Sequence, residues 1–117
     1  NIKADKVSKM VFCSGKIYYD LIAYRREQKI KDAVVVRIEQ LYPYPQDQID
    51  AIFTKYKKAD IRWVQEEPAN MGALNYIRNL FPNTAKMISR KPSASTATGF
   101  KKIHDRQQLE IMVKAFE

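Results

Sequence analysis

Apolar positions along the chain follow two spacings, one typical of buried strands and one typical of amphipathic helices. Short continuous apolar runs, such as 33–38, predict strands covered on both faces. The clearest repeat at i, i+3, i+4 and i+7, which predicts a helix, consists of Ile49, Ile52, Phe53 and Tyr56. The expected elements are a strand over 10–13, a helix over 16–28, a strand over 33–38, a helix over 46–56, a strand over 61–65, a helix over 71–80, a strand over 86–90 and a helix over 105–116.

Strand and helix alternate strictly in this series, which predicts an α/β fold: a three-layer α/β/α sandwich around a mostly parallel sheet. The β-branched run 33–38 is expected in the middle of that sheet, and the more polar run 86–90 at an edge. Residues 1–8 are polar and rich in lysine, and are expected to be a flexible lead-in to one domain over 9–117. The buried stripe of the last helix is expected to comprise Leu109, Met112, Val113 and Phe116.

The net charge is the unusual feature of the composition, because 21 lysines and arginines against 13 acidic residues give a charge of +8. Such an excess favours nucleic-acid binding, binding of a small anionic ligand, or a fragment separated from an acidic partner. The cations are spread over nearly every predicted element, and no nucleic-acid recognition motif is present. Nucleic acid is therefore the weakest of the three interpretations.

Features missing from the sequence narrow the class of protein further. No apolar run approaches the roughly 20 residues of a membrane span, and the first residues do not resemble a signal peptide, so no membrane partner is expected. Cys13, the one cysteine, lies in an apolar run and is expected to be a buried strand thiol, which fits a reducing cytoplasm. One cysteine and one histidine, His104, make no recognisable zinc site.

Polar side chains collect in the loops after the predicted strands, which in a parallel sheet meet at one ligand-binding edge. Glu66 and Glu67 follow the strand 61–65, and Pro68 is expected to end that strand. Neighbouring residues on extended backbone point to opposite sides, so the two carboxylates do not face one substrate as a catalytic pair. We expect one to cap the following helix or pair with an arginine, and the other to contact a neighbouring domain. The residues of the expected interface are Gln65, Glu66, Glu67 and Asn70.

Two other stretches have the composition of an anion site. Residues 14–16, Ser-Gly-Lys between a strand and a helix, suit a phosphate-binding turn, although a helix capped by Ser14 explains them more simply. Residues 89–91, Ser-Arg-Lys at a strand end, suit a phosphate or carboxylate, and a solvated basic turn explains them equally well. No GxGxxG, Walker or diphosphate–metal motif is present, so no catalytic, cofactor-binding or metal-binding residue is predicted.

Four segments occur in an order and spacing that identify a family. They read CSGKIYYDL over 13–21, VRIEQLYP over 36–43, QEEPANMGA over 65–73 and RKPSAS over 90–95. Together they resemble the carboxy-terminal domain of the thiamine-diphosphate-dependent dehydrogenase component of the 2-oxoglutarate dehydrogenase complex. The resemblance covers essentially the whole chain after the lead-in, including the closing helix.

The resemblance implies a transketolase-type carboxy-terminal domain that packs against the preceding domains of its own chain and against its dimer mate. In the family, the preceding domains hold thiamine diphosphate and magnesium. The homodimeric enzyme decarboxylates 2-oxoglutarate in the citric acid cycle and passes the succinyl group to the lipoyl-bearing succinyltransferase component of the multienzyme complex. The domain alone is expected to bind no cofactor and to be inactive, and its expected location is a bacterial cytoplasm.

The resemblance also implies a site for an activating nucleotide such as acetyl-CoA or AMP, which this domain borders in some members. The residues expected to line it are Ser89, Arg90 and Lys91, with Ser14 and Lys16 as neighbours. Arg90 and Lys91 stand where the family has two arginines, which keeps the charge but loses one bidentate fork. The alternative is a free-standing basic α/β module that binds a nucleotide or nucleic acid through its positive surface.

Overall fold

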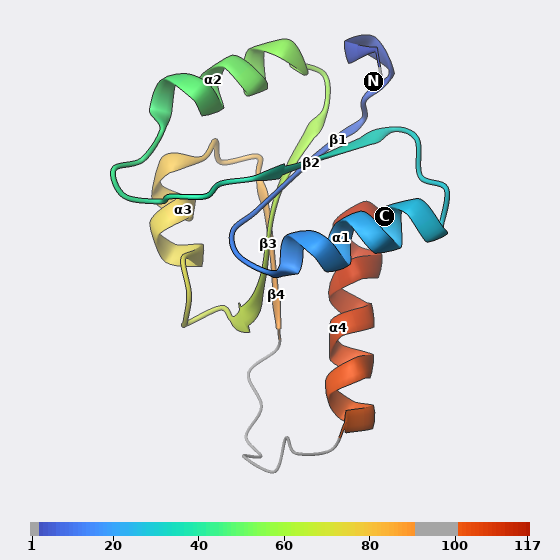
Figure 1. The fold of residues 1–117 in the computed structure, drawn as a ribbon. Helices are drawn as coiled ribbons and strands as arrows, with labels where there is room; N and C mark the ends of the chain where they lie inside the picture. Colours follow the sequence, from blue (N-terminus) through green and yellow to red (C-terminus); the bar gives the residue numbers. More distant parts are fainter. Residues whose placement is uncertain (1–2, 91–100) are drawn as a thin grey trace.

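The computed structural model describes residues 3–90 and 101–117, with the backbone alone for 101–104. Its elements are the short 3-10 helix η1 (Ala4–Lys6), β1 (Lys9–Cys13), α1 (Ile17–Glu27), β2 (Ala33–Arg37), α2 (Gln46–Lys55), β3 (Asp60–Pro68), α3 (Leu74–Leu80), β4 (Lys86–Arg90) and α4 (Lys101–Phe116) (Figure 1). All eight strands and helices expected from the sequence are present, and α4 starts four residues earlier than predicted. The division into a lead-in and one domain stays a prediction, and the loop expected over 91–100 lies outside the described residues.

The four strands form one parallel sheet in the order β2-β1-β3-β4, which confirms the predicted fold class. Phe12 of β1 pairs with Val36 of β2 on one side and with Trp63 of β3 on the other. The prediction that 33–38 lies mid-sheet is wrong, because β2 is an edge strand. The chain steps from β1 to β2 and then returns across β1 to β3, so the crossovers, and not the apolar composition of β2, decide its place. β4 occupies the other edge, as expected.

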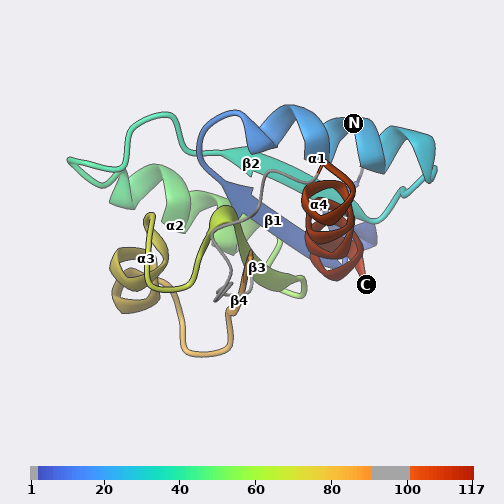
Figure 2. The same ribbon diagram turned by 90° about the horizontal axis from the view of Figure 1, so that it is seen from below.

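The helices cover both faces of the sheet and make the three layers (Figure 2). The side chains of β1 alternate between the two cores: Val11 and Cys13 pack with α1 and α4, and Met10 and Phe12 pack with α2 and α3. All four are buried, which is the pattern of a central strand in a parallel sheet.

The buried stripe of α4 differs from the predicted one. Its buried residues are Ile111, Met112, Ala115 and Phe116. Leu109 and Val113, expected to be buried, are 55% and 42% exposed. Both stripes have helical spacing, so tertiary contacts select between them. Phe116 stacks on Tyr24 with ring centroids 5.7 Å apart, and this contact helps to set the rotation of the helix.

Two predicted boundaries also move at the carboxyl-terminal edge of the sheet. β3 does not stop at residue 65 but runs through an irregularity to Pro68, which pairs with Arg90 of β4. α3 begins at Leu74 rather than residue 71, because Gly72 adopts a φ of +67° that no α-helix contains. The cap expected from Ser14 is wrong, since Lys16 is the N-cap of α1 and no side chain caps it.

Candidate functional site

Loops that follow β1, β2 and β3 converge on a hollow of about 630 Å³ at the carboxyl-terminal edge of the sheet. This loop hollow is lined by Ser14, Gly15, Leu41, Tyr42, Trp63, Glu67, Gly72, Ala73 and Tyr76. Its walls are mainly apolar and aromatic, Tyr42 is 82% exposed at its rim, and Glu67 is the one charged residue among those lining it. An exposed aromatic rim around a single carboxylate is typical of a contact surface.

Gln65 gives the floor of the loop hollow its shape. Its side chain is buried, and its Oε1 accepts a hydrogen bond from Trp63 Nε1 at 3.1 Å. Its Nε2 donates to the carbonyls of Glu67, Pro68 and Met71 at 3.1, 2.9 and 2.8 Å. The amide therefore fastens the end of β3 to the turn that precedes α3. Gln65 supports the edge from inside, and its predicted contact with another domain stays a prediction.

The loop after β2 is attached to α3 by tyrosines. Tyr76 donates its hydroxyl to the carbonyl of Leu41 at 2.9 Å, and its ring meets Tyr44 edge-on at 6.4 Å. The Tyr44 hydroxyl is buried without a hydrogen-bond partner among the described residues. Burial, and secondarily the nearby charge of Asp50, raises the pKa of Tyr44 to about 12. Tyr44 therefore stays neutral and serves as packing.

Arg90 is the centre of a second cluster, which ties β3, β4 and α4 together. Its Nε donates to the backbone carbonyl of Glu66 at 2.9 Å, and its two terminal nitrogens donate to the side chains of Gln107 and Gln108 at 2.7 and 2.8 Å. Gln108 in turn donates to the carboxylates of Glu66 and Asp20, each at 3.1 Å. Glu66 thus lies beside Arg90, as the sequence suggested, but its carboxylate bonds to the intervening glutamine.

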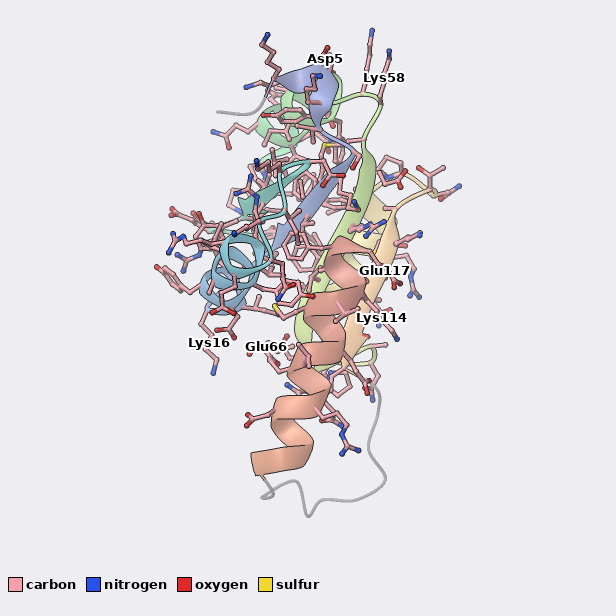
Figure 3. The ribbon with its side chains drawn as sticks, turned by 90° about the vertical axis from the view of Figure 1, so that its right-hand side faces the viewer. Asp5, Lys16, Lys58, Glu66, Lys114 and Glu117 are labelled. Carbon is pink, nitrogen blue, oxygen red and sulfur yellow. The ribbon has the colours of Figure 1, made fainter. Side chains whose placement is uncertain are left out.

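The alternative prediction, that one of these acids caps the following helix, is wrong: neither carboxylate caps α3, whose N-cap is Ala73 without a side-chain hydrogen bond. Glu67 is exposed and lines the loop hollow. Asn70 is exposed in the turn before α3. In Figure 3, Glu66 and Lys16 lie at a similar height of the molecule, well below Asp5 and Lys58, which lie together at the top of the view. The interface expected for Glu66, Glu67 and Asn70 stays a prediction.

A groove of about 340 Å³ runs between β4 and α4. This α4 groove is lined by Ser89, Arg90, Arg106, Gln107, Glu110, Ile111 and Lys114. Three cations outnumber its one carboxylate, so its charge suits an anion. The residues predicted for an activating nucleotide are divided: Ser89 and Arg90 line the α4 groove, whereas Ser14 lines the loop hollow. Lys16 is exposed at the start of α1, and Lys91 lies outside the described residues.

Comparison with known proteins gives the same family as the sequence pattern. The family model described as 2-oxoglutarate dehydrogenase C-terminal matches residues 1–116. The chain belongs to the 2-oxoglutarate dehydrogenase C-terminal family. It is 44% identical to an oxoglutarate dehydrogenase of Buchnera aphidicola, in an alignment that covers 98% of this chain and 13% of the relative.

Two further relatives of this 2-oxoglutarate dehydrogenase C-terminal domain come from different kinds of organism. A mitochondrial 2-oxoglutarate dehydrogenase of Dictyostelium discoideum is 45% identical over 83% of this chain and 10% of the relative. A 2-oxoglutarate dehydrogenase E1 component of Cupriavidus necator is 39% identical over 98% of this chain and 13% of the relative. The chain therefore spans about an eighth or less of the length of these relatives.

Sequence reasoning missed several residues of the 2-oxoglutarate dehydrogenase C-terminal domain that the structure places at these sites. They are Tyr42, Tyr76, Arg106, Gln107 and Gln108. The signal for the glutamines was present, because they precede the buried Ile111 and Met112 by one helical turn. Polar residues on the buried face of a helix indicate a partner inside the protein.

The described part of the 2-oxoglutarate dehydrogenase C-terminal domain offers little chemistry of its own. Burial raises the pKa of the Cys13 thiol to about 12, which confirms a buried, inert cysteine. Within residues 3–90 and 105–117, no three histidine, cysteine or acidic side chains gather as a metal site would require. None of the described helices is long and apolar enough to cross a membrane. The side chain of His104 lies outside the described residues.

Proposed function

We propose that the chain is the non-catalytic, structural and regulatory C-terminal domain of a 2-oxoglutarate dehydrogenase E1 component. The observation that carries this proposal is the family match over residues 1–116, together with the small share of each relative that the chain covers. The full enzyme decarboxylates 2-oxoglutarate and transfers the succinyl group to the lipoyl-bearing succinyltransferase of the citric acid cycle complex. The relatives include both bacterial and mitochondrial proteins, and the location that we propose for this chain is a bacterial cytoplasm.

Thiamine diphosphate and Mg²⁺ belong, in this proposal, to the other domains of the enzyme. A diphosphate–Mg²⁺ site needs oxygen ligands gathered around the cation. The described residues do not fit that requirement, because no cluster of three acidic, histidine or cysteine side chains is found among them. The contribution that we propose for this domain is to pack and to regulate.

The structural role belongs to the loop hollow and the turn beside it. Tyr42, which lines the loop hollow together with Glu67, is 82% exposed, and Met71 in the turn before α3 is 58% exposed. Large exposed apolar side chains around one charge favour a protein contact. We assign this surface to packing against the preceding domains of the same chain and against the dimer mate.

The regulatory role belongs to the α4 groove, which would take the phosphates of an activating nucleotide such as acetyl-CoA or AMP. Arg90 directs its Nε and its two terminal nitrogens to Glu66, Gln107 and Gln108, and these contacts orient the guanidinium in the groove. Ser89 adds a hydroxyl to this groove. Lys91, the next residue after Arg90 in the sequence, is also assigned to the proposed site. Ser14 and Lys16 belong to a neighbouring loop and are the outer members of the proposed site.

Calorimetric titration of the chain with AMP, acetyl-CoA and thiamine diphosphate tests the regulatory role and the assignment of the cofactor to other domains. We expect AMP or acetyl-CoA to bind, thiamine diphosphate not to bind, and the chain alone not to decarboxylate 2-oxoglutarate. Replacing Arg106 in the α4 groove with alanine should weaken nucleotide binding about tenfold, a loss of about 1.4 kcal/mol. The matched control is Arg78→Ala, at an exposed position on α3.

Tight binding of thiamine diphosphate, or decarboxylation by the chain alone, would overturn the proposal. If Arg106→Ala and Arg78→Ala weakened nucleotide binding equally, the α4 groove would not be the nucleotide site. Family membership favours a dehydrogenase domain over the free-standing basic module. That module predicts retention on immobilised nucleic acid that falls steeply with salt, which the same preparation can test.

A further inference from the structure

A strongly basic hollow lies away from the candidate site, where η1, the end of α1 and the loop to β2 meet. Its volume is about 590 Å³. It is lined by Lys6, Ile22, Arg25, Arg26, Lys29, Ile30 and Lys31. Five of these seven residues are cations and the other two are isoleucines, and no acid is among the lining residues. Five of the 21 lysines and arginines of the chain therefore line one hollow.

The cations of the basic hollow are not neutralised within the described part of the chain. The two ion pairs found there, Lys9–Asp32 and Arg62–Asp60, involve none of them. Asp32, which follows Lys31 in sequence, accepts hydrogen bonds from Ser8 and from Lys9, the latter at 3.1 Å, and these lower the pKa of Asp32. Like charges gathered around one hollow repel, so an anionic partner would relieve a cost that the isolated domain carries.

The α1 dipole explains only part of this cluster. Cations in the last turn of a helix are favourable by about 0.3–1 kcal/mol, which accounts for Arg25 and Arg26. Arg25 also donates its Nε to the carbonyl of Ala33 at 2.8 Å. Lys6 comes from η1 and Lys31 from the loop beyond the helix, so neither belongs to that last turn. Three separate segments bring charge to the same place.

The chemistry of the lining favours a protein partner over nucleic acid. Ile22 and Ile30 give the hollow an apolar floor beneath its cationic rim. Such a surface suits an acidic segment that also carries an apolar side chain. Binding of single-stranded nucleic acid uses aromatic rings on which bases stack, and none of the lining residues is aromatic.

We propose that the basic hollow docks an acidic segment from the part of the dehydrogenase polypeptide that precedes this domain. This inference rests on the proposed function. Lys6 lines the hollow and belongs to η1, the first described element, which lies beside the marked N-terminus (Figure 1). In a full-length dehydrogenase the preceding polypeptide therefore joins the domain next to η1. The chain accounts for 13% of the Buchnera relative, so most of such a polypeptide lies outside it. A tethered segment has a high effective concentration, so modest charge complementarity suffices to hold it.

Zero-length cross-linking of the full-length enzyme tests the docking. A carbodiimide joins a carboxylate to a lysine amine only when the two are in contact. We expect Lys6, Lys29 and Lys31 to link to aspartates or glutamates that precede position 1, with yields that fall at least fivefold in 0.5 M salt. Lys55, exposed on α2, is the internal control and should give no such links.

Charge reversal supplies the second measurement. The triple variant R26E/K29E/K31E should make cleavage ahead of the domain by limited proteolysis at least tenfold faster. The matched triple K55E/R78E/K86E, at exposed positions on α2, α3 and β4, should leave that rate unchanged. A circular dichroism melt of each variant shows whether the domain itself remains folded.

Several outcomes would overturn the docking. The first is that Lys6, Lys29 and Lys31 form no cross-links, and the second is that they cross-link to a separate protein or to the dimer mate. The third is that the protein binds nucleic acid and that R26E/K29E/K31E abolishes this binding. The proposed function fails differently, if the natural protein lacks preceding domains or does not decarboxylate 2-oxoglutarate with thiamine diphosphate. An active enzyme in which these cross-links do not form would therefore contradict the docking proposal but not the proposed function.

Discussion

At the scale of single residues, the carboxyl-terminal edge depends on the buried amide of Gln65. Its oxygen accepts a hydrogen bond from the Trp63 indole N–H, and its nitrogen donates hydrogen bonds to the carbonyls of Glu67, Pro68 and Met71. These part-buried hydrogen bonds join the end of β3 to the turn before α3, and a typical intramolecular hydrogen bond contributes about 0.5–1.5 kcal/mol to stability. The buried Gln65 side chain therefore fixes the backbone that carries the exposed residues of this edge.

Gly72 completes that support, so Gly72→Ala should destabilise the chain by about 2 kcal/mol. Its φ of +67° is unfavourable for alanine, and the new Cβ would lie 3.2 Å from the Oε1 atoms of Gln65 and Glu67. The midpoint and slope of urea unfolding measure this loss. Gly15→Ala is the matched control, because its φ of +84° carries the same backbone cost but nothing lies within 4 Å of the added carbon. Equal losses at both positions would mean that the contact with Gln65 contributes nothing.

Cys13 should make stability fall with pH above 9. Burial raises its pKa from the ordinary 9.0 to about 12, so above pH 9 the unfolded chain loses a proton that the folded chain keeps. The free energy of unfolding then decreases, by about 1 kcal/mol between pH 9 and 10. Cys13→Ala should flatten that slope in urea titrations between pH 8 and 10. Tyr44, with an ordinary pKa of 10.0, contributes only at higher pH. An unchanged slope in the variant would contradict this assignment.

At the scale of elements, the rotation of α4 about its axis decides which of two neighbouring apolar stripes is buried, and the sequence alone does not distinguish them. Ile111→Ala should cost about 2–4 kcal/mol, because Ile111 is 2% exposed in the core shared with α1. Leu109→Ala, at a position 55% exposed, should cost less than about 0.5 kcal/mol. Both changes remove branched aliphatic carbon from the same helix, and chemical denaturation compares them directly. A larger loss at Leu109 would restore the stripe predicted from the sequence.

The type and order of the elements were predictable because each strand and helix carries its own hydrophobic period. The strand order was not, since β2 is as apolar as a central strand and yet lies at an edge. The crossover connections decide that position, and the sequence of residues 33–38 contains no signal of it. The start of α3 depended similarly on Gly72, whose positive φ is fixed by the turn that Gln65 holds.

The candidate site was only partly predictable for the same reason. Ser89 and Arg90 stood out by residue type at a strand end, and both line the α4 groove. The acceptors that orient Arg90 are Gln107 and Gln108, 17 and 18 positions away in sequence. A local pattern does not join two segments across such a distance, whereas the fold does.

At the scale of the whole molecule, charge and apolar surface are distributed between different places. The basic hollow beside η1 and α1 has five cations and no acid in its lining. The loop hollow at the carboxyl-terminal edge has aromatic walls and the single carboxylate of Glu67. A domain with two such unlike surfaces is suited to contact different parts of a larger enzyme, each selected by its own complementarity.

The carboxylate of Glu67 should therefore matter for assembly rather than for chemistry. In the full-length enzyme, Glu67→Gln removes a charge from the rim of the loop hollow with little change of shape. We expect dimer or domain association, followed by sedimentation velocity, to weaken about tenfold, or about 1.4 kcal/mol. Decarboxylation per assembled active site should stay unchanged, because the chemistry is proposed to lie in other domains. Asp47→Asn, an isosteric change at an exposed position on α2, should alter neither quantity. A Glu67 variant that assembles normally but no longer decarboxylates 2-oxoglutarate would move this residue from the interface into the catalytic machinery.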